Sequence, residues 1–493
     1  MKFDVLKKQL SQGEAVVFYL IVSFLYVLPF ILSDYLYVDD GWRSVFARAD
    51  FSDEGRVLTD MLYGLLSLSH AAPNMFPLAL LLAITVLALA LARLSRHYFT
   101  DLTYSRCLVV LPLLYCPFFL QNLTYQYDGP SMILGIVASI LAVTYQEQVF
   151  WKRTAMPALL VAVLTAFYQP MINVFVGLCC IEVFRLLERG EPLERIFRVT
   201  GDKLLQLGIG VVIYYVTAYP LMGDERKTLI KLDASAIAEI GSRIMLFFDG
   251  TPETFTGASY GLVLCLSGVA AVGYCWVVVE MLRSDIRARE KLIRALLYSV
   301  LLGVLGLSIH GIMLVFEPFN LGARTLVGAS VLLMFLFYLS ASVLVRCYPQ
   351  AGVLLAVPLL YMLSFSYAYG RVLMMRQEME KTISFNLSYD VFSRVELRKV
   401  KKFHLQDDDS GWVPAAQGTL AVMPGIDDIM GLGAAVSSAA LLRVGMDNVE
   451  DADESYLSKD KLDDFGMPVV NNKFYDIYLG GEEGLIMMKQ IKP

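Results

Sequence analysis

Long apolar runs, separated by short polar segments, fill the first three quarters of this 493-residue chain. A helix rises about 1.5 Å per residue, so about 20 apolar residues cross the hydrocarbon core of a bilayer, which is about 30 Å thick. The pattern therefore predicts an α-helical polytopic membrane protein with about eleven transmembrane helices. We place them at roughly 15–32, 75–94, 107–121, 130–145, 155–168, 170–187, 204–221, 258–282, 295–316, 324–345 and 350–369.

One apolar run, from Met156 to Leu187, is too long for a single span. Tyr168-Gln169-Pro170 lies near its middle, and a proline disfavours helix at the residue before it. We therefore divide this run into two helices at that tripeptide.

Composition agrees with a membrane protein and argues against a soluble one. Hydrophobic residues make up 57% of the chain and charged residues only 18%, against about 25% charged in a typical soluble domain. The formal net charge of −6 belongs to residues 371–493, which hold 14 Lys and Arg against 20 Asp and Glu. No basic patch suggests a nucleic-acid partner. The seven cysteines lie in or beside apolar segments, without zinc-ligand spacing.

The loops suggest an orientation. Lys and Arg are concentrated in the loops that are cytoplasmic if the N-terminus is cytoplasmic, including Arg185–Lys203 and Arg283–Arg294. An odd number of spans then places the tail outside. We therefore predict a transmembrane domain at 1–370, its first span a retained anchor, and a small soluble α/β domain at 371–493 on the non-cytoplasmic side.

Within the expected soluble parts we predict several elements. Amphipathic helices at 56–68 and 234–248 belong to two outer loops. In the tail we predict a helix near 389–402, a strand at Thr419–Met423, and a hairpin of Phe474–Leu479 with Leu485–Gln490.

Polar residues that could perform chemistry open the first outer loop, residues 33–74. Asp39 and Asp40 follow the first span closely, where the headgroups of lipid substrates lie, and either could take a proton from an attacking hydroxyl. Trp42, Arg43 and Arg56 could stack on a sugar ring or neutralise a phosphate. The alternative is that Asp-Asp-Gly is only a solvated turn.

The next outer loops add further candidates. Tyr125, Tyr127 and Asp128 lie in a short loop, where Asp128 could serve a site or simply cap the following helix. Tyr168 and Gln169 lie at the helix break, where a local kink is the alternative explanation.

Glu317 and Arg324 link the ninth and tenth spans, and Arg324 could bind a lipid phosphate or merely snorkel and pair with Glu317. No Walker motif, dinucleotide fingerprint or phosphate-binding glycine loop is visible. If the protein transfers a sugar, the donor must therefore arrive already activated on a lipid.

The Asp pair with Trp-Arg and Gly-Arg, the outer Tyr-x-x-Asp loop and the Tyr-Gln pair, in that order, resemble the serotype-converting O-antigen glucosyltransferases of bacteria and phages. This family belongs to the polytopic GT-C superfamily. The resemblance covers the membrane part and is weakest over residues 371–493.

The resemblance implies an inverting transfer of a sugar, usually glucose, from undecaprenyl phosphate to O-antigen repeats of lipopolysaccharide. It would take place at the periplasmic face of the bacterial inner membrane. Asp39 or Asp40 would be the base, and Arg43, Arg56 and Arg324 would bind the donor phosphate. Tyr127, Asp128 and Gln169 would meet sugar or acceptor hydroxyls. A divalent cation such as Mg²⁺ or Mn²⁺ is compatible with an Asp pair but not required.

Two other readings stay open. An O-antigen polymerase or ligase, or another lipid-linked glycan enzyme, would also use large outer loops, but with more Arg and His. A transporter or flippase would place ionisable residues near the bilayer midplane. Here the polar residues of interest lie at the outer ends of the spans.

Overall fold

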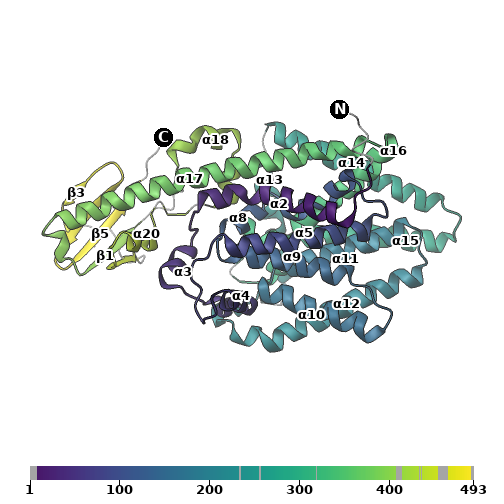
Figure 1. Cartoon of the computed structure of the whole chain (residues 1–493), viewed down its shortest axis with the longest axis horizontal. Coiled ribbons are helices and arrows are strands. Elements are labelled where there is room, and N and C mark those ends of the chain that lie inside the picture. The colour runs from purple at the N-terminus through teal and green to yellow at the C-terminus, as the bar shows by residue number, and fades with distance from the viewer. Residues whose placement is uncertain are drawn as a thin grey trace.

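A bundle of long helices and a small β-sheet domain, joined by one helix, make up the computed structural model (Figure 1). The structure describes residues 8–231, 235–254, 257–317, 319–406, 413–431, 433–434, 436–452 and 465–489. The connecting helix α17 spans Ala356–Ser393 and runs out of the bundle into the sheet domain (Figure 1). Each body has its own hydrophobic core, and the core of the sheet domain includes residues of α17 from Ile383 onward. The domain boundary that we predicted between residues 370 and 371 therefore falls inside the continuous helix α17.

Seven helices of the described chain are long and apolar enough to cross a membrane, so the protein is a polytopic membrane protein. They coincide with predicted spans, although they do not confirm the number eleven. They are α2 (Gln12–Ser33), α5 (Leu78–Tyr98), α10 (Phe150–Phe167), α12 (Leu193–Thr217), α14 (Gly257–Arg283), α16 (Gly328–Cys347) and α17.

Three more helices occupy predicted spans but are shorter or more charged: α9 (Asp128–Thr144), α11 (Met171–Glu188) and α15 (Ala288–Leu307). The break predicted at Tyr168-Gln169-Pro170 is confirmed, since α10 ends at Phe167 and α11 begins at Met171.

The single helix predicted at 107–121 is wrong. The chain forms short pieces there: α6 (Tyr104–Cys107), η2 (Leu108–Val110), α7 (Pro112–Tyr115) and α8 (Phe119–Thr124). Prolines cause the breaks, because a proline lacks an N–H and restricts the residue before it. Cys116, which precedes Pro117, accordingly leaves the helical conformation.

The first outer loop folds into α3 (Asp40–Phe46), the 3₁₀ turn η1 (Phe51–Glu54) and α4 (Val57–Ser67). Helix α4 confirms the amphipathic helix predicted at 56–68. Stacked rings of Phe51 and Tyr63, with Tyr127 tilted against both, pack this loop onto the bundle. The second predicted amphipathic helix is α13 (Ala236–Thr254), and Ala234 lies outside the described residues.

Short 3₁₀ turns connect the remaining outer and inner segments. They are η3 (Tyr219–Leu221), η4 (Asp224–Lys227), η5 (Gly311–Val315), η6 (Ala323–Thr325), η7 (Ala351–Leu355), η8 (Leu397–Lys399) and η9 (Pro414–Ala416).

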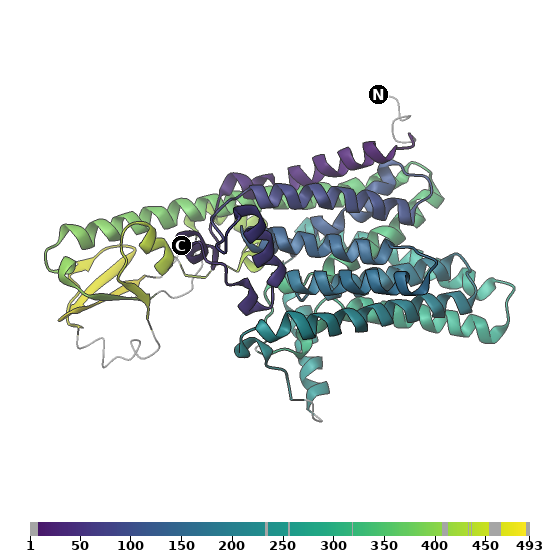
Figure 2. The same cartoon turned by 60° about the horizontal axis from the view of Figure 1, so that its bottom comes forward.

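The tail forms a five-stranded mixed sheet in the order β2-β1-β5-β4-β3 (Figure 2). The strands are β1 (Lys402–Gln406), β2 (Val449–Asp451), β3 (Val470–Asn471), β4 (Tyr475–Gly480) and β5 (Glu483–Met488). Short helices α18 (Gln417–Val422), α19 (Gly425–Met430) and α20 (Ser438–Arg443) lie in the connection between β1 and β2.

The predicted hairpin is confirmed as β4 and β5, paired in antiparallel register from Tyr475↔Met488 to Gly480↔Glu483. Its expected last residue, Gln490, lies outside the described residues. The helix predicted at 389–402 is wrong, because α17 ends at Ser393 and the chain turns so that β1 can bury Phe403 between β2 and β5. The strand predicted at Thr419–Met423 is also wrong, because residues 419–422 belong to helix α18.

Candidate active site

The segments that carry the predicted site residues meet at one end of the bundle, the end from which α17 leaves toward the sheet domain and where α3 and α4 lie (Figure 1). This end holds the end of α2, the loop with α3 and α4, the start of α9, the α10–α11 break and the turn η6 before α16. The basic segment from Arg185 to Lys203 lies at the α11–α12 turn, at the opposite end. The topology therefore brings together residues that are almost 300 positions apart in sequence.

Asp128, the first residue of α9, is the centre of the cluster. It is 1% exposed and accepts hydrogen bonds from Arg43 Nη1 at 2.9 Å and Arg56 Nη1 at 2.6 Å. A buried carboxylate requires such pairing, since an isolated charge in a low-dielectric environment is very costly. Asp128 thus ties α9 to both arginines of the first outer loop.

Glu54, the last residue of η1, is a second carboxylate that pairs with the same two arginines. Its carboxylate lies 3.2 Å from Arg43 Nη2, 2.7 Å from Arg56 Nη1 and 3.3 Å from Arg226 Nη2. Asp50 Oδ1 lies 3.2 Å from Arg43 Nε as well, so the carboxylates of Asp50, Glu54 and Asp128 and two largely buried guanidinium groups form one connected unit, with Arg226 at its exposed edge.

Asp39 and Asp40 have different environments despite being neighbours. Asp40 is fully buried, and its carboxylate accepts hydrogen bonds from the backbone N–H groups of Tyr37 at 3.3 Å, Gln126 at 2.8 Å and Tyr127 at 3.4 Å. Burial raises the pKa of Asp40 to about 8. These bonds fasten the first outer loop to the loop before α9, which is a structural role.

The Asp39 side chain keeps 49% of its surface exposed, and its Oδ2 lies 3.9 Å from Arg43 Nη1. Partial burial raises the pKa of Asp39 above its usual range, while Arg43 and Arg324 act in the opposite direction. Of the two acidic residues, only Asp39 combines exposure to solvent with proximity to the Arg43 guanidinium.

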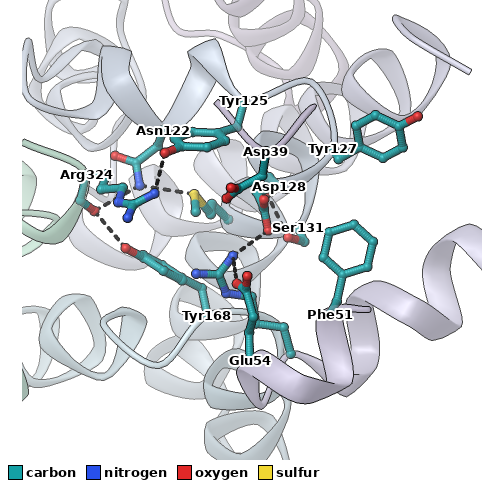
Figure 3. Close-up of polar contacts among 12 residues, drawn as sticks. Asp39, Phe51, Glu54, Asn122, Tyr125, Tyr127, Asp128, Ser131, Tyr168 and Arg324 are labelled. Carbon is teal, nitrogen blue, oxygen red and sulfur yellow. Dashed lines mark hydrogen bonds and ion pairs between the residues drawn. The ribbon is translucent and has the colours of Figure 1, made fainter. Parts of the chain in front are cut away.

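Arg324 approaches this cluster from the other side (Figure 3). Its guanidinium donates to the hydroxyl of Tyr125 and forms no ion pair within the described part of the chain. Its backbone is held tightly: Arg324 N donates to Gln121 Oε1 at 2.7 Å, and Arg324 O accepts from Asn122 Nδ2 and Tyr168 Oη. The pair with Glu317, which the sequence left open as an alternative, does not form, since Glu317 pairs with Arg243.

The α10–α11 break positions the remaining candidates. Gln169 Nε2 donates to Glu54 O at 2.7 Å and to Tyr214 Oη at 3.0 Å, and the Arg56 guanidinium lies over the Tyr168 ring at 5.0 Å. Gly55 permits this approach, since its φ is +73° and a Cβ there would lie 2.5 Å from Tyr214 Oη.

A pocket of about 480 Å³ opens beside the cluster, between the ends of α10, α11 and α12 and the turns η3 to η6. Its charged lining residues are Arg56, Arg226 and Arg324 together with Glu54, Glu225 and Glu317. Its apolar lining residues include Ile172, Val211, Ile312, Met313 and Phe316. Because Glu54 already pairs with Arg56 and Glu317 with Arg243, Arg324 stays available, and the pocket can accept a ligand that has an anionic group and an apolar portion.

Three predicted residues lie at the margin of this arrangement. The Trp42 ring stacks on Phe46 at 5.7 Å on helix α3, and Tyr127 belongs to the small aromatic core under the first outer loop. Glu317 lines the pocket but pairs with Arg243 of α13. Their placement gives them supporting positions rather than central ones.

The described residues contain no group of three or more His, Cys, Asp or Glu side chains that could hold a metal ion. Both oxygens of Asp128 already bind guanidinium groups. A divalent cation therefore does not fit the cluster as it stands, and the arginines provide its positive charge.

Sequence reasoning missed Glu54, Arg226 and the pair Gln121 and Asn122. Glu54 directly precedes the Gly55-Arg56 pair, which the sequence analysis used as part of the site. That adjacency was the signal that could have identified Glu54. Gln121 and Asn122 belong to a segment that was expected to end a membrane span. Only the break in that helix lets both side chains form hydrogen bonds with the backbone of Arg324.

Comparison with known proteins identifies the family of the chain. The family model described as glucosyl transferase GtrII matches residues 28–392. The chain belongs to the GtrII glucosyl transferase family. The matched region includes every residue of the cluster from Asp39 to Arg324 and ends within the last turn of α17. The sheet domain thus lies outside the region that defines GtrII.

This GtrII protein is also similar to an uncharacterised 55.3 kDa protein of Salmonella phage P22, encoded in the gtrB 5′ region. The two are 24% identical over 246 residues, which is 48% of this chain and 50% of the phage protein. The chain thus matches only about half the length of this curated relative. No solved structure matches the chain.

Proposed function

We propose that this GtrII protein is an inverting glycosyltransferase that moves a sugar, glucose by its family, from a polyprenyl-phosphate donor to O-antigen repeats. The reaction would occur at the periplasmic face of the inner membrane, with the sheet domain on the same side. Family membership supports the class of reaction, and the pocket lined by Arg56 and Arg324 supports the kind of donor.

One observation supports the donor assignment most strongly. Arg324 has no carboxylate partner within the described chain, although it lines a pocket that holds both charged and apolar residues. A guanidinium matches phosphate geometry, and its charge is worth most where water is excluded. A phosphate linked to an apolar chain suits this lining, because the anion can meet Arg324 and Arg56 while the lipid contacts the apolar residues.

The chemistry follows from this placement. Asp39 takes the proton of an acceptor hydroxyl as that oxygen attacks the anomeric carbon of the donor sugar. The bond from that carbon to the phosphate oxygen breaks, and the phosphate leaves with the bonding electrons. Arg324 and Arg56 stabilise its charge, so no second acid is needed. A single displacement inverts the configuration at the anomeric carbon.

Arg43 and Asp128 act through position. Asp128 holds Arg43 and Arg56 at fixed places, and Arg43 lies beside the Asp39 carboxylate. Preorganised charges of this kind need little rearrangement during the reaction, which is the main source of electrostatic catalysis. Replacing Asp128 would release both arginines at once.

The test is an analysis of lipopolysaccharide from isogenic cells with and without this protein, by mass spectrometry and linkage analysis. We expect a hexose-sized mass increment on the O-antigen repeats only when the protein is present. Unchanged repeats with normal levels of membrane-inserted protein would refute the proposed acceptor.

A further inference from the structure

A second, smaller pocket lies outside the cluster around Asp128, where α17 leaves the bundle. It measures about 160 Å³, several times the roughly 30 Å³ share of one water molecule. Its walls come from the segment after α2, from α17 and from α20, and they include Tyr35, Leu36, Gln377, Lys381, Ser384 and Arg443. Polar groups thus converge on a space that is large enough for one sugar ring.

One of these polar groups has no partner. Ser384 is 2% exposed, and its Oγ forms no hydrogen bond with any described residue. A helical serine usually satisfies its hydroxyl on the carbonyl four residues earlier, so a free buried hydroxyl facing a pocket is unusual. Beside it, Glu380 accepts hydrogen bonds from Tyr35 Oη at 3.2 Å and Arg443 Nη2 at 2.9 Å, which keeps the pocket walls in place.

Aromatic rings continue from this pocket along the same helix. Phe385, which lines the pocket, is 63% exposed, Tyr389 is 73% exposed and Phe392 is 47% exposed. Their spacing of four and three residues places them on one face of α17. We call these three residues the aromatic stripe.

The aromatic stripe lies too far along α17 to be buried in a membrane. Phe385 is 29 residues from the start of α17 at Ala356, or about 44 Å, whereas the hydrocarbon core is about 30 Å thick. Exposed aromatic rings in water are costly unless a ligand covers them. The apolar C–H faces of sugar rings can do so, while their hydroxyls can reach the polar groups of the pocket.

The pocket adjoins the candidate active site. Leu36 lies three residues before Asp39, so their Cα atoms are within about 11 Å of each other. On the other side, α20 packs against α3: a Cβ on Gly41 would lie 3.0 Å from Ala439 Cβ. One glycan chain can therefore occupy the pocket with one sugar and present a neighbouring sugar to Asp39.

We propose that the pocket around Ser384 and the aromatic stripe of α17 together bind the acceptor glycan. This inference rests on the proposed function, which it deepens by assigning the acceptor to the sheet-domain side and the lipid donor to the pocket lined by Arg56 and Arg324. The sheet domain then serves to hold α17 and α20 at the pocket.

The experiment measures binding of purified, radiolabelled O-antigen polysaccharide to the full-length protein in detergent by equilibrium dialysis. The variants are Ser384→Leu, which fills the pocket, and the double variant Phe385→Ala/Tyr389→Ala. The matched control is Asn386→Ala, an exposed position on the same turn of α17. We expect both test variants to raise the dissociation constant about tenfold or more, and the control to stay within twofold of the wild type.

Equal polysaccharide affinity in the wild type and both test variants would overturn the inference. Loss of binding to phosphatidylglycerol vesicles in the variants, with polysaccharide binding retained, would also overturn it, because the stripe would then be a membrane contact.

A parallel transfer assay separates the two proposals. A wild type that transfers sugar while the variants bind polysaccharide normally refutes only the acceptor site. A wild type that binds polysaccharide through the stripe but transfers nothing refutes only the proposed function.

Discussion

Asp39 and Asp40 are adjacent in the chain, but their carboxylates lie in opposite environments. Asp40 is fully buried under three backbone N–H groups, whereas the Asp39 side chain is half exposed and 3.9 Å from Arg43. The sequence left open which of them could serve as a base. The geometry favours Asp39, because a hydroxyl of the acceptor can reach only that carboxylate.

Substitution by Asn should separate the two roles. In Asp40→Asn an amide NH₂ group replaces one acceptor oxygen and faces a backbone N–H, so we expect a loss of about 1–3 kcal/mol in stability. Asp39→Asn should leave the melting temperature in detergent unchanged, as should the control Asp53→Asn, an exposed carboxylate in the same loop. The account fails here if Asp39→Asn lowers the melting temperature more than Asp40→Asn.

The acid side of the pH profile should report Asp39. Only the ionised carboxylate can accept a proton, so kcat/KM falls as pH falls through its pKa. Burial raises the pKa of Asp39, and Arg324 counteracts that increase. We therefore expect an acid limb above the ordinary Asp value of about 3.9, moving to higher pH in Arg324→Ala. Initial rates measured across pH give the position of the acid limb. If the limb lies at the same pH in the wild type and in Arg324→Ala, the base is a residue other than Asp39.

Arg324 should act on the leaving phosphate. Removing one preorganised charge of this kind costs about 10²–10³ in rate, which we expect for Arg324→Ala. Arg324→Lys should recover only part of the activity, since lysine keeps the charge but loses the planar fork. The matched control is Arg48→Ala, an exposed arginine of the first outer loop. Equal rates for Arg324→Ala and Arg48→Ala at saturating donor would contradict the assignment.

Gly55 should tolerate no side chain. Its backbone is left-handed, and an added Cβ would collide with Tyr214 Oη and with Gln169 Nε2, which lies 2.6 Å away. We expect Gly55→Ala to displace Arg56 and Glu54 and to lose most activity, with a stability cost of about 1–3 kcal/mol. Gly208→Ala on α12, where an added Cβ meets no atom within 4 Å, is the control and should be neutral or mildly stabilising. Transfer rates and melting temperatures of the two variants check this.

Hydrophobic periodicity predicted most helices of the bundle, because a membrane span must be long, apolar and internally hydrogen-bonded. It failed at 107–121, where Cys116, the residue before Pro117, leaves the helical conformation and ends a segment that periodicity alone treats as one helix. It failed in the tail for another reason: strand formation at Thr419–Met423 depends on a partner strand that local sequence does not reveal.

For the candidate site, charged residues at helix ends were a usable signal, and the structure brings Asp39, Arg43, Arg56, Asp128 and Arg324 to one place. Sequence could not predict how they pair. The sequence left open a pair of Arg324 with Glu317, which is seven residues away, but Glu317 binds Arg243 instead. Glu54 was missed because nothing local distinguishes it from Asp50 or Asp53; only the fold of η1 turns it toward both arginines.

The most direct test of the account is a reconstituted transfer reaction with purified protein, chemically defined polyprenyl-phosphate glucose and O-antigen polysaccharide. Product amount and anomeric configuration are measured by mass spectrometry and NMR. We predict that the wild type transfers glucose with inversion, and that Asp39→Asn is slower by about 10²–10⁴. Transfer by Asp39→Asn at the wild-type rate, or a product with retained configuration, would contradict the central claim.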